Sequence, residues 1–192
     1  MNWITNLVRP KVKGMTGGGK DGRGNDMPEN LWKKCPSCGE MIFHRDLVAN
    51  MNVCPKCGHH MRIGPAERFA YTFDPHSFTE LPPVTVAADP LRFKAEKKYA
   101  DEMKAAKSKT GRPEAFSAAR GTVDGLPVML AVQSFDFLGG SLGMAVGEAF
   151  IAAVEAAIAD RRPFLFFVAS GGARMQESML SLMQMPRTTI AV

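Results

Sequence analysis

The sequence predicts an α/β fold: a layer of parallel βαβ units that follows a small four-cysteine zinc ribbon. Two observations support this prediction. Four cysteines stand in two closely spaced pairs within residues 31–63, and residues 113–192 twice show the order strand, glycine-rich loop, helix. The composition agrees, because 45% apolar and 22% charged residues are typical of a globular protein.

The cysteines follow the pattern Cys-x2-Cys-x15-Cys-x2-Cys, formed by Cys35, Cys38, Cys54 and Cys57. Two residues between cysteines allow a tight turn to direct both sulfurs at one ion, and the glycine after each pair permits a left-handed backbone. Four thiolates complete a tetrahedral shell, so we predict one structural Zn²⁺ per chain rather than a catalytic ion. Disulfides are the alternative. His59 and His60, directly after the second pair, are interpreted as surface or interface residues.

The positive charge is concentrated in the first third of the chain. Residues 1–70 carry 11 Lys and Arg against 6 Asp and Glu, which accounts for the whole net charge of +5. This balance suits nucleic acid, an acidic carrier or a phosphate-bearing substrate, although solubility alone also explains it. Residues 1–30 are predicted to be a flexible basic tail. No apolar run approaches the ~20 residues of a membrane span and no secretion signal is found, so we expect a cytoplasmic protein without membrane contact.

Residues 64–112 are predicted to form a helical connector between the ribbon and the layer. A short helix and an extended stretch come first. A longer helix is then expected from Asp89 to about Lys107, because Asp is a good N-cap and Pro90 suits the first helical position. Gly111 is expected to end this helix.

The layer begins with a hairpin and continues with a parallel crossover. Residues 116–123 and 126–134 are strand-like and are joined at Asp124-Gly125, a typical hairpin signal. Residues 144–160 are alanine-rich and predicted helical. Phe164–Val168 is a continuous apolar run, as expected for a strand buried on both faces.

Two glycine-rich loops, residues 139–143 and 170–172, each follow a predicted strand and precede a predicted helix. In a parallel layer both loops lie beyond the carboxyl ends of their strands, where open α/β folds bind ligands. Glycine allows a ligand to approach the main chain, and a helix N-terminus offers unpaired N–H groups. Such a loop suits a phosphate or the oxyanion of a reacting carbonyl.

Residues 173–185 are predicted to form the helix after the second loop. A packed core face is the expected role of four residues at helical spacing, with a binding surface as the alternative: Met175, Met179, Leu182 and Met183.

Several standard catalytic sites are excluded. A nucleophile elbow fails because Val168 stands where its first glycine belongs, and all cysteines belong to the two pairs. The backbone amides of Gly171 and Gly172 remain, and they suit stabilisation of an enolate oxygen. Arg174 is a candidate for substrate contact or for a structural ion pair. Glu177 is a candidate for a direct role or for favouring the helix dipole.

Five motifs occur in an order that closely resembles the beta subunits of the multi-subunit acetyl-CoA carboxylase carboxyltransferase of bacteria and plastids. The resemblance extends from about Leu31 to Val192. The motifs are Cys35-Pro-Ser-Cys38, Cys54-Pro-Lys-Cys57-Gly-His-His60, Phe135-Asp-Phe-Leu-Gly-Gly-Ser-Leu-Gly143, Ser170-Gly-Gly-Ala-Arg-Met-Gln-Glu177 and Ser181-Leu-Met-Gln-Met185.

The resemblance implies a crotonase-like (ClpP/crotonase) fold with an N-terminal zinc ribbon. It implies transfer of a carboxyl group from carboxybiotin, supplied in trans on a carrier protein, to acetyl-CoA, giving malonyl-CoA for fatty-acid synthesis. The implied partners are a carboxyltransferase alpha subunit in an α2β2 assembly, the biotin carboxyl carrier protein and biotin carboxylase. ATP binding is implied as well.

The resemblance also implies site roles. Gly171 and Gly172 would donate their amides to an oxyanion, while Gly139, Gly140, Ser141 and Arg174 would bind the acyl-CoA substrate. Biotin itself would serve as the base after losing CO2, which agrees with the lack of an obvious protein base.

Members of this family are substantially longer than 192 residues, and a crotonase-like layer needs further βα units to close its core. We therefore expect residues 113–192 to be the N-terminal part of the layer, and this stretch alone to be inactive. The alternative function is a zinc-ribbon protein that binds nucleic acid through its basic first third.

Overall fold

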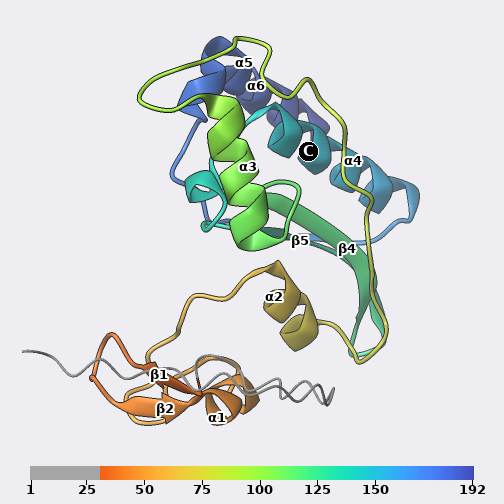
Figure 1. The fold of residues 1–192 in the computed structure, drawn as a ribbon. Coiled ribbons are helices and arrows are strands. Elements are labelled where there is room, and N and C mark those ends of the chain that lie inside the picture. The colour runs from red at the N-terminus through yellow and green to blue at the C-terminus, as the bar shows by residue number, and fades with distance from the viewer. Residues whose placement is uncertain (1–30) are drawn as a thin grey trace, which may run out of the picture.

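The computed structural model describes residues 31–192, so the predicted tail 1–30 lies outside the described residues. A small cysteine-bearing module lies at one end and an α/β layer at the other (Figure 1). The module comprises β1 (Trp32–Lys34), β2 (Met41–Phe43) and α1 (His44–Ala49), with β1 antiparallel to β2. Its small core is built around Cys35, Cys54, Ile42 and Leu47.

The layer contains a four-stranded sheet with the order β3-β4-β5-β6. Residues of the predicted connector belong to this layer, because β3 pairs with β4 and α2 packs on the sheet. The elements are α2 (Pro65–Thr72), β3 (Thr79–Glu80), α3 (Tyr99–Thr110), β4 (Phe116–Val123), β5 (Leu126–Gln133), α4 (Met144–Ala159), β6 (Phe164–Phe167), α5 (Ser178–Leu182) and α6 (Gln184–Ala191), with short 3-10 turns at Leu138–Gly140 and Met175–Glu177.

The β4–β5 hairpin confirms the prediction from sequence. Asp124 and Gly125 both have positive φ, 50° and 75°, as a tight hairpin turn requires. The Asp74 carboxylate secures this turn, accepting the N–H groups of Asp124 and Gly125, both at 2.9 Å, and the Thr122 hydroxyl at 2.6 Å. The Thr122 hydroxyl and then the two amides hold the pKa of Asp74 below its ordinary value.

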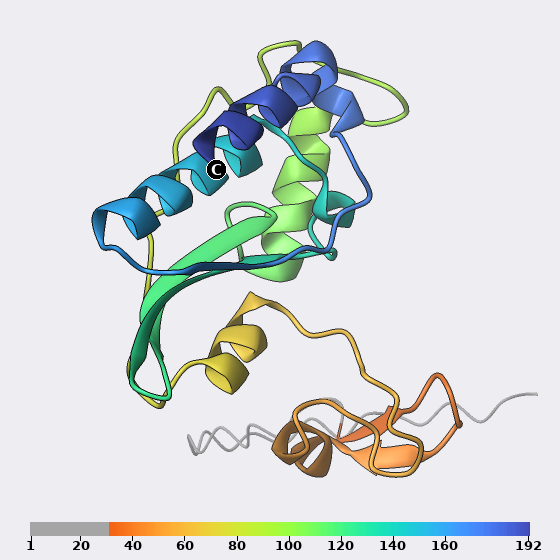
Figure 2. The ribbon, with the colours of Figure 1, turned by 180° about the vertical axis from the view of Figure 1, so that it is seen from behind.

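Side chains alternate between the two faces of the sheet, as the period of a strand dictates. On one face Leu130 and Val132 pack against Phe69 of α2 and against Phe73, which directly follows that helix. On the other face Ala131 and its neighbours pack against α4. The views from both sides show α2 below the sheet and α3, α4 and α6 above it (Figures 1 and 2).

β5, α4 and β6 form the predicted parallel crossover, with Ala131 opposite Phe166 in the register. The carboxyl ends of β5 and β6 therefore meet at one edge of the sheet, and both glycine loops lie there. Within the described residues, no helix is long and apolar enough to span a bilayer.

The prediction of a helix from Asp89 to Lys107 was wrong at its start. Asp89 caps only a turn, in which its Oδ1 accepts the Phe93 N–H at 3.1 Å. The backbone of Arg92 then takes a left-handed conformation, φ 49°, which breaks the helical path. The helix begins at Tyr99 and ends at Thr110, and the following Gly111 has φ 64°, which is typical of the residue that ends a helix.

β6 is not buried on both faces, as its continuous apolar sequence predicted. Phe164 and Phe166 pack toward α4, whereas Leu165 and Phe167 are exposed. On the face to which Leu165 and Phe167 point, α2 packs mainly on β4 and β5, and this leaves the face of β6 largely open within residues 31–192.

The single helix expected over residues 173–185 is divided. A 3-10 turn is followed at Ser178, φ 47°, by α5 and then by α6. The core role expected for the methionine face was also wrong, because its side chains are exposed. This outcome favours the alternative of a binding surface. The exposed residues are Met175, Met179, Leu182 and Met183.

Candidate functional site

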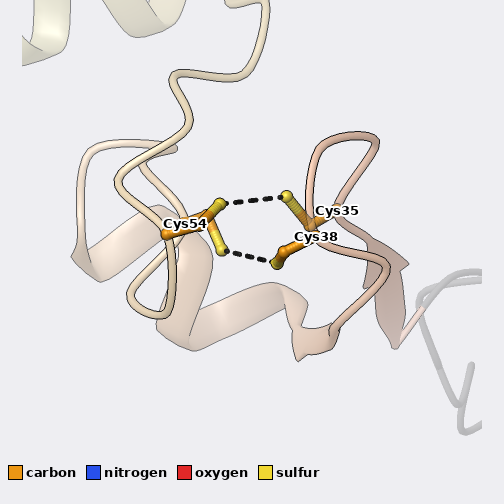
Figure 3. Close-up of side chains that lie close together, drawn as sticks. Cys35, Cys38 and Cys54 are labelled. Atoms are coloured by element: carbon orange, nitrogen blue, oxygen red, sulfur yellow. Dashed lines mark hydrogen bonds between the residues drawn. The ribbon is translucent and has the colours of Figure 1, made fainter.

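The four cysteines converge as the spacing predicted. Their sulfurs all lie within 4.8 Å of one another, and the Cys35–Cys57 and Cys38–Cys54 sulfurs are 3.7 and 3.8 Å apart (Figure 3). Such separations are far longer than the ~2.05 Å of a disulfide bond, and the four cysteines are free. The arrangement therefore fits a shared metal ion and not the disulfide alternative.

The two cysteine turns have the same construction. The N–H groups of Gly39 and Gly58 each donate to the carbonyl of the first cysteine of their pair at 2.9 Å. Both glycines are left-handed, with φ of 76° and 71°. These turns direct two sulfurs each toward one point, which is the geometry of a structural zinc knuckle.

The electrostatics of the thiols also suit a cation. The Cys38 N–H lowers the pKa of Cys35 to about 6. The Glu40 N–H lowers the pKa of Cys38, but burial and the hydrogen bonds from Cys57, Cys35 and Cys54 outweigh it and raise that pKa to about 12. Crowded thiols resist joint ionisation, and a bound Zn²⁺ removes this resistance by neutralising them. His59 and His60 lie outside the four-sulfur cluster, and His60 is exposed.

At the other end of the molecule the two glycine loops are hydrogen-bonded to each other. The Gly171 N–H donates to the Gly139 carbonyl at 2.8 Å, and the Leu142 N–H donates to the Gly172 carbonyl at 2.8 Å. The Arg174 N–H then donates to the Leu142 carbonyl at 3.0 Å. The sequence placed both loops at one sheet edge, and the structure shows that they form one continuous unit.

The two amides predicted as oxyanion donors differ in availability. The Gly171 N–H is held by the loop–loop bond to Gly139. The Gly172 N–H contacts only the exposed Ser170 hydroxyl at 3.1 Å, a partner that a substrate oxygen can replace. Gly172 also has φ 114°, a conformation that side chains rarely adopt, and open space where a Cβ would stand. Of the two, Gly172 is the better placed donor.

Arg174, a candidate substrate contact, is 1% exposed and is fully engaged within the chain. Its guanidinium holds Glu114 in a two-point ion pair, with Nη1–Oε2 at 2.9 Å and Nη2–Oε1 at 2.6 Å. Nε and Nη2 donate to the Ser141 hydroxyl and carbonyl, both at 3.0 Å. This geometry supports the structural ion pair that the sequence left open. Ser141, another candidate substrate contact, is likewise bound to Arg174.

The Glu177 side chain does not act on the dipole of the helix that follows it in the chain. It caps the N-terminus of α4 instead. Its Oε2 accepts the Met144 N–H at 2.5 Å, the first amide of α4, and its Oε1 accepts the Tyr99 hydroxyl at 2.6 Å. A buried carboxylate at this position satisfies an otherwise unpaired amide and the positive end of the α4 dipole.

Two site residues, Tyr99 and Glu114, were missed from the sequence. Each lies at least 60 residues from Arg174 along the chain, and no local motif marks either one.

A cavity of ≈ 690 Å³ adjoins the first glycine loop. Leu138 and Gly139 form its wall on the loop side, and Phe135 carries the guanidinium of Arg62 over its ring at 4.7 Å. Its size is within the range of small-molecule sites.

Comparison with known proteins identifies the family. Residues 32–57 match the acetyl-CoA carboxylase zinc finger domain, and residues 63–191 match the carboxyl transferase domain. The chain belongs to the carboxyl transferase family. Its α/β layer is thus of the crotonase-like type, preceded by a zinc ribbon, as the motifs implied.

Relatives at 52–54% identity align along all 192 residues. Two of them are the acetyl-coenzyme A carboxylase carboxyl transferase subunits beta of Mesorhizobium japonicum, 54% identical, and Azorhizobium caulinodans, 52% identical. The chain covers 61% and 63% of these proteins, so it spans about three fifths of their length. This agrees with the expectation that family members are longer.

A solved structure is also similar to the chain. It is a transcarboxylase 12S chain, described with methylmalonyl-coenzyme A and methylmalonic acid bound, with a TM-score of 0.51 and 31% identity. The match covers 66% of this chain and 22% of that one. ATP binding, which the motifs also implied, gains no support from the family models or from the names of these relatives.

Proposed function

We propose that this carboxyl transferase chain acts as the beta subunit of acetyl-CoA carboxylase carboxyltransferase. The reaction moves a carboxyl group from carboxybiotin, held on a carrier protein, to acetyl-CoA, and the product is malonyl-CoA. The observation that carries the proposal is the union of the two glycine loops at one sheet edge, with the Gly172 amide available to a substrate oxygen.

Loss of a proton from the acetyl methyl group places negative charge on the thioester oxygen. The Gly172 N–H is suited to bind that oxygen, because backbone donors fixed in a loop need no reorganisation as charge develops. The Gly171 N–H can join it only by giving up the bond to Gly139. The new C–C bond would form between the methyl carbon and the CO2 released when the N–C bond of carboxybiotin breaks, and the ureido nitrogen freed by that break would take up the methyl proton.

Each part of the chain has a place in this proposal. Gly139 and Gly140 would line the acyl-CoA side, beside the ≈ 690 Å³ cavity. Arg174 and Ser141 would shape the loops rather than touch substrate. One Zn²⁺ on the four cysteines would hold residues 31–63 together.

The proposed partners are an alpha subunit in an α2β2 assembly, the biotin carboxyl carrier protein and biotin carboxylase, and the proposed location is the cytoplasm. The relatives are named as beta subunits of a carboxylase, and this supports a multi-subunit assembly. The exposed methionine face and the exposed outer face of β6 provide apolar surface for such contacts.

The test is reconstitution of the longest reading frame that contains this chain with an alpha subunit and biotinylated carrier. Labelled carboxyl transferred from carboxybiotin to acetyl-CoA is expected, and transfer should stop when either subunit is omitted. Salt-dependent binding of DNA or RNA together with no acyl-CoA binding and no transfer would instead support the nucleic-acid alternative.

A further inference from the structure

We infer that Tyr99 and Glu114 are positioning residues for the proposed reaction: through Arg174 and Glu177 they hold the second glycine loop against the first. These four residues are termed the clamp. The inference rests on the proposed function for its catalytic consequence, but the clamp itself can be measured without it. None of the four needs to touch substrate.

The clamp joins five segments of the chain at one buried point. Arg174 follows the second glycine loop, and its guanidinium binds Glu114, two residues before β4, and Ser141 in the first glycine loop. Glu177 reaches the first amide of α4 through Met144. The guanidinium therefore bridges the two loops directly.

The Tyr99 hydroxyl connects the two charged members of the clamp. It accepts the Arg174 Nη1 hydrogen bond at 3.1 Å and donates to Glu177 Oε1 at 2.6 Å. Burial is the main cause that raises the pKa of Tyr99. The hydroxyl therefore keeps its proton and can donate one hydrogen bond while it accepts another. Burial alone would lower the pKa of Arg174, but the hydrogen bonds and charge of Glu114 outweigh it and raise that pKa.

Burial makes the members of the clamp depend on one another. The exposed fractions are 1% for Arg174, 1% for Tyr99, 3% for Glu177 and 8% for Glu114. Charged groups removed from water need their partners, because no solvent can replace a lost one. Loss of one member should therefore move the others, and with them the loops to which they belong.

The first loop passes directly over the clamp. A Cβ on Gly143 would lie 2.7 Å from Glu177 Oε1 and 2.9 Å from the Arg174 guanidinium carbon. The Leu142 amide, which makes one of the two loop–loop bonds, directly precedes Gly143 in the chain. A shift of the guanidinium therefore changes the separation of the loops, and with it the position of the Gly172 amide.

The test is Tyr99→Phe, which keeps the ring and removes only the shared hydroxyl. Tyr71→Phe is the matched control, because it also removes a tyrosine hydroxyl that makes a hydrogen bond. That bond is the part-buried one from the Asn52 amide at 2.6 Å, at the junction of the zinc module and α2. Amide hydrogen exchange is measured on the chain for both variants. Loss of one buried hydrogen bond should raise the rate of amide exchange by a factor of about five. We expect at least about that acceleration at Gly171, Leu142 and Arg174 in Tyr99→Phe, with the β4–β5 hairpin unchanged.

A second readout uses the assembled enzyme. Misplacement of about 1 Å can lower turnover about 100-fold, so we expect Tyr99→Phe to lower kcat by on the order of tenfold or more. The KM for acetyl-CoA should change less than about twofold, because the clamp does not touch substrate. Glu114→Gln should act in the same direction, and Tyr71→Phe should leave kcat and the loop amides unchanged.

Two results would overturn the inference. One is unchanged loop exchange and unchanged kcat in Tyr99→Phe. The other is equal acceleration of the loops and the hairpin, which would show a general loss of stability. If the unsubstituted assembly transfers no carboxyl group, the proposed function fails, while the exchange measurement still decides whether the clamp holds the loops.

Discussion

Gly140 lies where the first glycine loop passes over the backbone of the second. Its φ is 64°, and a Cβ at this position would overlap the Ala169 carbonyl oxygen and lie 3.0 Å from the carbonyl carbon. Backbone atoms cannot rotate away as a flexible side chain can. The loops can therefore pair only because residue 140 has no side chain.

Gly140→Ala should consequently destabilise the chain by about 1–3 kcal/mol beyond the cost of its positive φ. Gly139→Ala is the matched control, because Gly139 has nearly the same φ, 66°, but open space around its Cβ. Thermal unfolding of both variants measures the difference. Equal melting temperatures for the two would contradict the close approach of the loops.

The zinc module is an element whose fold should depend on its metal. Its small core contains Cys35 and Cys54 themselves, together with Ile42 and Leu47. Few other apolar contacts hold residues 31–63, so loss of the ion should remove most of their order.

Cys35→Ser should therefore release Zn²⁺ and unfold the module while the β4–β5 hairpin persists. His60→Ala, next to the second cysteine pair but exposed, should retain one zinc per chain. Metal analysis and amide exchange on each variant check this. Full zinc content with protected module amides in Cys35→Ser would show that the four sulfurs are not a joint ligand set.

The β4–β5 turn should depend on pH through Asp74. The pKa of this carboxyl is lower in the folded chain than its ordinary value of about 3.9. Its contribution to stability is thus complete above that ordinary pKa and is lost as the pH falls through the folded value.

Asp74→Asn should lower the melting temperature at pH 7, and the difference from the unsubstituted chain should shrink as the pH falls below about 4. Melting curves from about pH 2 to pH 7 give the comparison. A difference that stays constant with pH would show that the charged form of Asp74 does not secure the turn.

The elements predicted well from sequence were those with local signals. The hairpin at Asp124-Gly125 and the two cysteine turns depend on residues within a few positions of one another. The core role predicted for the methionine face was wrong, because periodicity shows which side chains share a side of a helix and does not show whether another element covers that side. The prediction of a helix start at Asp89 was wrong for a similar reason. Asp89 does cap a turn, but the left-handed backbone of Arg92 ends that turn before a helix forms.

At the scale of the whole molecule, the glycine-loop edge was predictable and the clamp beneath it was not. Parallel strands place their following loops at one edge by topology alone. Tyr99 and Glu177, by contrast, meet across 78 residues of sequence, and only the assembled fold brings them together. The role of Arg174 stayed open from sequence because an arginine serves equally well in substrate contact and in an ion pair.

The 192-residue chain alone should not form malonyl-CoA. It spans about three fifths of its relatives' length, and the proposed reaction also requires an alpha subunit. Incubation of the purified chain with acetyl-CoA and carboxybiotin, with product measured by mass, should give no turnover above background. Robust turnover would show that residues 31–192 hold a complete site.

The most direct test of the central claim is turnover by Gly172→Val in the complete assembly. A side chain there would crowd the thioester, and loss of one oxyanion donor costs about 10²–10³ in turnover. Gly125→Val is the control, because Gly125 also has a positive φ and open space but lies in the distant hairpin. We predict a loss of at least about 10² for Gly172→Val, with zinc content and subunit assembly intact, and near-normal turnover for Gly125→Val. Near-normal turnover in a well-folded Gly172→Val enzyme would contradict the account.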